Sequence, residues 1–211
     1  MKFRLLGLLL VNMAAVVAVA QTQPASAPAE EMVDNPTYQA WAQYKAGTTV
    51  TLDSKTEVVA EADAPPMALM SMNITNTLKD VTPDHVVVEV KMTMSMMGQN
   101  RPMPARETKI PAKIEKSKAD FSAFTGSKKD DPKVSDVKDG TDTIEVSGKK
   151  LECKTKEMNI EMKQGADTMK GTAKIWSNAE VPGGLVKNVM TTKEPMVSTM
   201  TMNVTSYEVK K

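Results

Sequence analysis

Methionine is the residue type in this chain whose spacing could support chemistry. Thioether sulfurs are soft ligands that select Cu(I), and the same flexible side chains also fill cores or line surfaces that accept varied apolar ligands. The chain has 18 methionines among 211 residues. Seven of them stand at alternating positions of three segments: Met70 and Met72; Met92, Met94 and Met96; Met200 and Met202. The spacing therefore leaves two interpretations, a copper site or an apolar interior.

The copper interpretation would use five of these thioethers: Met92, Met94, Met96, Met200 and Met202. No His or Cys stands beside them to complete a tight site, so we prefer the apolar interpretation and predict no metal and no cofactor. The single histidine, His85, follows Thr82-Pro83-Asp84 at the entrance of a predicted strand. No serine or cysteine nucleophile stands at a suggestive position, and the common catalytic and phosphate-binding motifs do not occur in the sequence. We predict that the protein is not an enzyme.

The first twenty residues have the form of a secretory signal. Lys2 and Arg4 precede a short apolar run, and Ala18-Val19-Ala20 is a small-x-small cleavage site. Cleavage after Ala20 predicts an exported protein, periplasmic or extracellular, with no transmembrane segment in the mature chain. Loss of the two cations changes the net charge from +1 to −1, which argues against a nucleic-acid partner. Residues 21–34 are predicted to be a disordered lead-in to a single domain, residues 35–211.

The predicted strand at residues 85–97 is the element that must position the methionines. Its apolar side chains alternate strictly with polar ones from Glu89 onward, which indicates one buried and one wet face. Those apolar residues are Val86, Val88, Val90, Met92, Met94 and Met96. Similar alternation recurs at 48–60, 67–78, 106–114, 143–146, 150–162, 168–176, 185–191 and 196–209. We expect a mainly β fold, a single curved antiparallel sheet or open barrel of about 8–10 strands.

One short helix is predicted before the sheet. Asn35 is a good N-cap, Pro36 suits the first helical position, and Gly47 is a typical C-terminal stop. Tyr38 and Trp41 share one face of this helix, from Pro36 to about Ala46, and are predicted to form an aromatic lid on the sheet.

Three further local predictions concern less regular stretches. Residues 97–104 are predicted to be a loop, and residues 115–142 to be the least structured part, with one helical turn at 119–124. Leu151 and Cys153 alternate in one phase and Met158 and Ile160 in the other, which indicates a β-bulge between them. Cys153 is the only cysteine, so it cannot form an internal disulfide. It falls on the same face of a strand as Leu151, and we therefore predict a buried thiol.

Three segments carry a resemblance to known proteins. They read Val-Ser-Gly-Lys-Lys-Leu-Glu-Cys-Lys at 146–154, Lys-Ile-Trp-Ser at 174–177 and Val-Pro-Gly-Gly-Leu-Val-Lys at 181–187. They resemble a group of uncharacterised exported bacterial β-rich proteins with a loop of the VPGGLVK type. The layout as a whole resembles the periplasmic lipoprotein carrier and receptor half-barrels, the LolA- and LolB-like proteins. That resemblance implies a curved sheet with an apolar concave face covered by helices.

The sequence thus predicts an exported, non-enzymatic protein of unknown role that binds a lipid or other apolar ligand, such as an acyl chain, in a groove. The groove or core residues would be Met70, Met72, Ile74, Val88, Val90, Met92, Met94, Met96, Met200, Met202 and Val204. Two alternatives stay open: a methionine-rich Cu(I)-binding periplasmic module, and a structural or protein-interaction domain with a filled interior and no small ligand.

Overall fold

A computed structural model describes residues 31–59, 65–96, 99–116, 133–164, 167–194 and 197–210. The predicted signal peptide with its cleavage site after Ala20, and most of the predicted lead-in, lie outside these residues. The predicted helical turn at 119–124 also lies outside them. No helix in the described ranges is long and apolar enough to cross a membrane.

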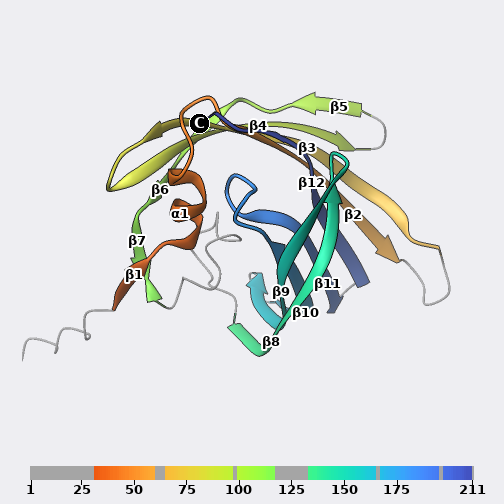
Figure 1. Ribbon diagram of the computed structural model, residues 1–211. Coiled ribbons are helices and arrows are strands. Elements are labelled where there is room, and N and C mark those ends of the chain that lie inside the picture. The colour runs from red at the N-terminus through yellow and green to blue at the C-terminus, as the bar shows by residue number, and fades with distance from the viewer. Residues whose placement is uncertain are drawn as a thin grey trace, which may run out of the picture.

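Strands dominate the described part of the chain, and a single short helix accompanies them (Figure 1). The elements are β1 (Met32–Asp34), α1 (Pro36–Ala42), β2 (Thr49–Val59), β3 (Met67–Val81), β4 (His85–Met96), β5 (Gln99–Pro102), β6 (Arg106–Pro111), β7 (Lys113–Glu115), β8 (Lys133–Val146), β9 (Lys149–Gln164), β10 (Asp167–Ser177), β11 (Leu185–Glu194) and β12 (Val197–Glu208). The prediction of a curved antiparallel sheet with one short N-terminal helix is confirmed.

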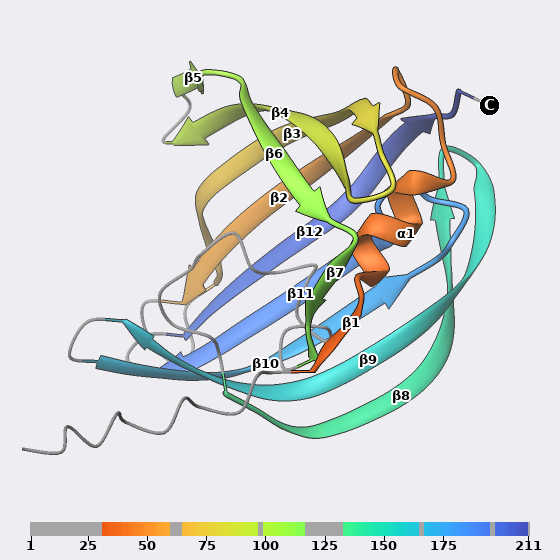
Figure 2. The same ribbon diagram turned by 90° about the vertical axis from the view of Figure 1, so that its left-hand side faces the viewer.

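Two meanders make up the main sheet, which has ten strands in the order β5-β4-β3-β2-β12-β11-β10-β9-β8, with β6 paired to β4. The first meander runs from β2 to β5 and the second from β8 to β12, and every pair is antiparallel. The pairing of β12 with β2 joins the two. Figure 2 shows the sheet curving so that α1 lies on its inner side. A separate pair, β1 with β7, lies beside α1.

Helix α1 begins as predicted and ends four residues early. Asn35 is its N-cap and Pro36 occupies the first turn. The chain leaves the helix after Ala42, where the Tyr44 amide donates to the carbonyl of Trp41 at 3.0 Å. That i→i−3 bond tightens the last turn. The next amide, of Lys45, donates to the Lys210 carbonyl, so contact with the C-terminal segment replaces further helix.

Three predictions about irregular stretches need correction. The lead-in is structured from Met32, because β1 pairs with β7. The predicted loop at 97–104 contains β5, and the least structured stretch at 115–142 contains β7's end and β8 from Lys133 onward. The last two corrections share one reason: β5 and most of β8 are exposed strands at the two edges of the main sheet. Backbone pairing forms such strands without a buried face, so they show no apolar alternation.

The predicted bulge in β9 is also wrong. Strand β9 pairs with β10 without a register shift. The irregularity lies instead in β8, which has one extra residue between Ser135 and Lys138 opposite β9, and Asp136 there has a φ of 53°. Both phases of β9 are buried because each packs into a different cluster, Leu151 in one and Met158 in the other.

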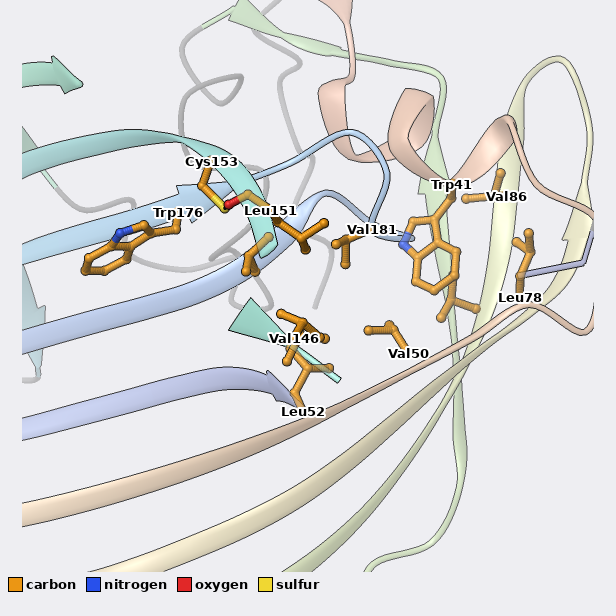
Figure 3. Packing of buried hydrophobic residues seen from close by; sticks show 13 residues of the cluster. Trp41, Val50, Leu52, Leu78, Val86, Val146, Leu151, Cys153, Trp176 and Val181 are labelled. Atoms are coloured by element: carbon orange, nitrogen blue, oxygen red, sulfur yellow. The ribbon is translucent and has the colours of Figure 1, made fainter. Parts of the chain in front are cut away.

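The larger hydrophobic cluster joins α1 to both meanders (Figure 3). Its buried members are Trp41, Val50, Leu52, Leu78, Val86, Val88, Val146, Leu151, Cys153, Trp176, Val181, Val186 and Val204. Figure 3 shows Trp176 at one end of it and Trp41 toward the other end, near Val86 and Leu78. The smaller cluster lies farther along the second meander and consists of Met158, Ile160, Ala173 and Ile175. Cys153 is 1% exposed, so the predicted buried thiol is confirmed.

Candidate functional site

The strand registers define one face of the sheet, here called the inner face. Leu52 of β2 lies opposite Ile74 of β3 and Val204 of β12. Ile74 in turn lies opposite Met92 of β4. Paired residues in an antiparallel sheet point to the same side, and so do residues two apart in a strand. Because Leu52 packs in the same cluster as Trp41 of α1, this side is the one that α1 covers.

Methionines occupy the part of the inner face that α1 leaves uncovered. One row across the strands contains Met96, Met70, Thr56, Met200 and Met190 in order. The next row contains Met94, Met72, Ser54, Met202 and Asn188. We call the methionine face the set Met70, Met72, Met92, Met94, Met96, Met190, Met200 and Met202. All are partly buried except Met96, which is 46% exposed.

A pocket of about 200 Å³ lies between α1 and the inner face. It is lined by Thr37, Trp41, Val50, Leu52, Asn76, Val88, Val90, Thr108, Ile110, Pro182, Gly183 and Leu185. Aliphatic side chains and one indole dominate this set, as in sites that bind apolar molecules. A second pocket, of about 390 Å³, lies on the other side of the 183–185 segment and shares Thr37, Gly183 and Leu185 with the first. The two pockets therefore adjoin along one segment of chain beneath α1.

Hydrogen bonds at both ends of α1 fix it over these pockets. The Asn35 side chain accepts from the Thr37 amide at 3.0 Å and donates to the Pro111 carbonyl at 2.8 Å. The Tyr38 hydroxyl donates to the Thr82 carbonyl at 2.8 Å. At the other end, Gln43 Nε2 donates to the carbonyl of Ala179 at 2.7 Å. Helix α1 is thus held to β6, to the β3–β4 turn and to the loop before β11.

The predicted groove residues fall into two groups. Val88, Val90 and the lid residue Trp41 line the 200 Å³ pocket, and Trp41 is 3% exposed. Ile74 and Val204 pack in the larger cluster, and Tyr38 packs against its edge. The predicted methionines lie on the same inner face but line neither pocket beneath α1. The pockets are therefore displaced from the methionines toward the helix.

Sequence reasoning missed several lining residues. Val50 and Leu52 alternate within a predicted strand, so their periodicity could have placed them with the predicted set. Pro182, Gly183 and Leu185 lie in and after a loop, and no local pattern indicates that this loop folds back onto α1.

The five methionines of the copper interpretation do not converge. Strands β4 and β12 are separated by β3 and β2, which keeps Met200 and Met202 away from the β4 methionines. A different set does come together: Met70 faces Met96 and Met72 faces Met94 across β3 and β4. Directly opposed residues have β-carbons about 4.5–5.5 Å apart. In the described part of the chain, no three His, Cys, Asp or Glu side chains are placed to hold a metal ion.

The other side chains that could support chemistry, those of His85, Cys153 and Asp142, each contact a neighbouring protein group. His85 Nδ1 lies 3.0 Å from the Thr82 hydroxyl in the β3–β4 turn. The Cys153 thiol contacts the Leu151 carbonyl at 3.6 Å, and burial raises its pKa. On the other side of the sheet, the Trp176 indole donates to Asp142 at 2.8 Å, and this bond lowers the pKa of the carboxyl group.

The outer face carries a polar hollow. It has a volume of about 690 Å³ and is bordered by polar side chains such as Asp53 and Asn73, which are hydrogen-bonded to each other at 2.7 Å. Met70 and Met72 border it from within β3.

No family model and no curated protein sequence matches the chain. Three solved structures are similar to it. A Bacteroides fragilis protein described as exported, with a YmcC-like fold, is 10% identical over 78% of this chain and 97% of its own, with a TM-score of 0.47. A Parabacteroides distasonis protein described as a lipoprotein is 12% identical over 80% and 98%, with a TM-score of 0.49. A LolA superfamily protein from Nitrosomonas europaea is 9% identical over 85% and 94%, with a TM-score of 0.25. At these identities the function of the chain has to be argued from its own residues.

Proposed function

We propose that this chain is an exported, non-enzymatic protein that binds a lipid or acyl chain on the inner face of its sheet. The observation that carries the proposal is the apolar pocket under α1, bounded by Trp41, Val50 and Val90. On the same face, the uncovered methionines extend the apolar surface beyond the helix. An acyl chain in the pocket would continue over the methionine face without meeting a charged residue of β2 or β3.

The energetics favour a ligand of this class. Burying one methylene contributes about 0.8 kcal/mol, so a chain of about eight buried methylenes would gain about 6 kcal/mol before the cost of immobilisation. Methionine side chains have three rotatable bonds and adapt to chains of different length. The pocket under α1 alone is smaller than the usual 300–1,000 Å³ of a small-molecule site. The adjoining 390 Å³ pocket and the methionine face supply the rest of the surface.

The two tryptophans allow a direct test. Trp41 lines the pocket, whereas Trp176 lies at the far end of the cluster, with the amines of Lys174 and Lys187 each 5.1 Å from its ring. A bromine-labelled fatty acid quenches an indole that it touches. In a Trp176→Phe protein, which keeps Trp41, we expect saturable quenching by this ligand.

The matched variant is Trp41→Phe, which keeps Trp176 and should show little quenching at the same ligand concentration. Equal quenching of both variants would place the ligand elsewhere. Absence of quenching in Trp176→Phe, together with no heat of binding in calorimetry, would overturn the proposal.

A Cu(I) site is the second candidate, and the cross-strand methionine pairs are the observation that favours it. Met72 and Met94 face each other beside the pair Met70 and Met96, so four thioethers lie together. The test is a Cu(I) competition titration on the wild type and on a Met72→Leu/Met94→Leu protein. Leucine preserves the apolar area but removes the sulfur. Copper binding lost in the variant would favour the metal, and fatty-acid binding kept in it would separate the two functions.

Export is tested on the mature protein. Cleavage after Ala20 would leave Gln21 as the first residue of the secreted form. N-terminal sequencing of protein recovered outside the cytoplasm would identify that residue, and an uncleaved Met1 in the same fraction would contradict the predicted signal.

A further inference from the structure

Three buried side-chain atoms of the described residues have no hydrogen-bonding partner: Ser54 Oγ, Asn76 Oδ1 and Asn188 Oδ1. All three belong to the inner face. Ser54 lies two residues from Leu52, Asn76 lies opposite Val50 and Val90, and Asn188 lies opposite Met202. Buried polar groups in folded proteins are almost always bonded, so three exceptions on one face need an explanation.

Ser54 and Asn188 lie within the methionine face. Met202 of β12 lies between them, directly opposite Ser54 on β2 and Asn188 on β11. Neighbouring strands are about 4.8 Å apart, so the two polar side chains are separated by about 10 Å. Ser54 is 2% exposed and Asn188 is 4% exposed. The third atom belongs to Asn76, which lines the pocket under α1.

The hydrogen-bonding capacity of these three groups shows which kind of partner each one requires. An amide oxygen can only accept, so Asn76 Oδ1 and Asn188 Oδ1 each require a donor. The hydroxyl of Ser54 can accept as well as donate. A plain hydrocarbon chain, an ester carbonyl or a carboxylate offers no donor to an amide oxygen. A hydroxyl group does, and it can accept a bond from a neighbouring group at the same time.

We propose that the ligand of the inner face is a hydroxyl-bearing acyl chain, whose hydroxyl bonds to Ser54 or Asn188 on the methionine face. This inference rests on the proposed function and narrows its ligand class. In the free protein the two polar residues are almost fully buried, and Met202 lies on the strand between them. Their thioether chains rotate readily, so an entering chain can displace Met202 and reach the groups on either side of it.

The test compares ligands of equal length. Octadecanoic acid, 3-hydroxyoctadecanoic acid and 12-hydroxyoctadecanoic acid are titrated into the full mature protein by calorimetry. We expect at least one hydroxy acid to bind about tenfold more tightly than the unsubstituted acid, a factor equivalent to about 1.4 kcal/mol. Ser54→Ala or Asn188→Leu should reduce that tenfold preference to about threefold or less.

Ser71→Ala is the matched control. Ser71 is an exposed serine of β3 that lies opposite Ser95 on the outer face, so its loss should change neither affinity. A stability measurement separates binding from a structural role. Because the Ser54 hydroxyl is buried without a partner, Ser54→Ala should unfold at the same or a higher urea concentration than the wild type. A hydroxyl with a structural partner would make the variant less stable.

Each outcome decides between the two proposals. If none of the three acids binds, the proposed function fails. If all three bind with equal affinity, the proposed function stands and the inference about the hydroxyl is overturned. If a hydroxy acid is preferred but both variants keep the full preference, another part of the protein recognises the hydroxyl, which also overturns the inference.

Discussion

Gly183 lies against the indole of Trp41 so closely that a β-carbon on the glycine would be 2.8 Å from Trp41 Nε1. The glycine has a φ of +81°, and its amide donates to the carbonyl of Ala40 at 3.3 Å. Both residues line the pocket beneath α1. The loop before β11 therefore forms a wall of the pocket by direct backbone contact with the helix.

Gly183→Ala should destabilise the protein by about 2–5 kcal/mol. A left-handed backbone costs a non-glycine residue about 1–2 kcal/mol, and overpacking against a buried ring costs about 1–3 kcal/mol more. The measurement is the urea midpoint of unfolding. Gly148→Ala is the control, because Gly148 has a φ of +78° with no atom within 4 Å of the added carbon. It should lose only about 1–2 kcal/mol, and equal losses in the two variants would show that the Trp41 contact is unimportant.

Asn35→Ala should destabilise the protein by about 2 kcal/mol, because it removes the helix cap together with the bond to the Pro111 carbonyl. Asn35→Ser keeps an acceptor for the helix but is too short to replace the donor to Pro111. We expect it to recover about 1 kcal/mol relative to the alanine variant. Thermal or urea unfolding of the pair measures both contributions. Identical stability of the two variants would mean that the cap does not contribute.

The stabilising contribution of the ionised Asp142 carboxylate should be lost in acid. Its pKa is lowered chiefly by the hydrogen bond from Trp176, then by the backbone bond from Thr143. For a carboxyl group with a lowered folded-state pKa, the stabilisation is complete above the ordinary value of 3.8 and is lost as the pH falls through the lowered pKa. Asp142→Asn should therefore show a smaller decrease in urea midpoint between pH 6 and pH 2.5 than the wild type. Parallel decreases would contradict the assignment.

Cys153 should react with a maleimide only when the protein unfolds. The thiol is buried and its pKa is raised by burial, so both access and thiolate formation are disfavoured in the native state. Labelling in native buffer should be slower than in 6 M urea by several orders of magnitude and should accelerate with the unfolding transition. Rapid labelling of the folded protein would show that the β8–β9 end of the sheet opens locally.

The central strands could be predicted because one of their faces is buried. Val88, Val90 and Met92 alternate with the charged residues Glu89 and Lys91. Strand β4 begins at His85 and ends at Met96, within one residue of the prediction. Strand β5 and the part of β8 before Thr143 could not be predicted in the same way, since these strands lie at the edges of the sheet and expose most of their side chains. The bulge predicted in β9 was wrong for a different reason: the sequence shows that both phases of this strand contain apolar residues, but not that the two phases pack into different clusters.

Some residues of the candidate site could also be predicted from the sequence, and others could not. Val88 and Val90 were predicted and do line the pocket. Ser54 and Asn188 were not predicted to belong to the site, because a lone polar residue in a strand is ordinarily solvated. Only the pairing of β2, β12 and β11 places them on either side of Met202. The pairing order also separates Met200 from Met96, which spacing along the chain cannot show.

By itself, the sequence determined the class of the fold, the position of α1 after Asn35, and the alternation that gathers methionines on one side of each strand. These properties depend on contacts between residues near each other in the chain, so local periodicity and capping preferences encode them. The tertiary structure alone decided which strands are neighbours, that the 178–184 loop packs against Trp41, and that three polar atoms of the described residues lack partners on the inner face. Trp41 and Gly183 are 142 positions apart in the chain, and Ser54 and Met202 are 148 apart. No local pattern specifies contacts over such separations.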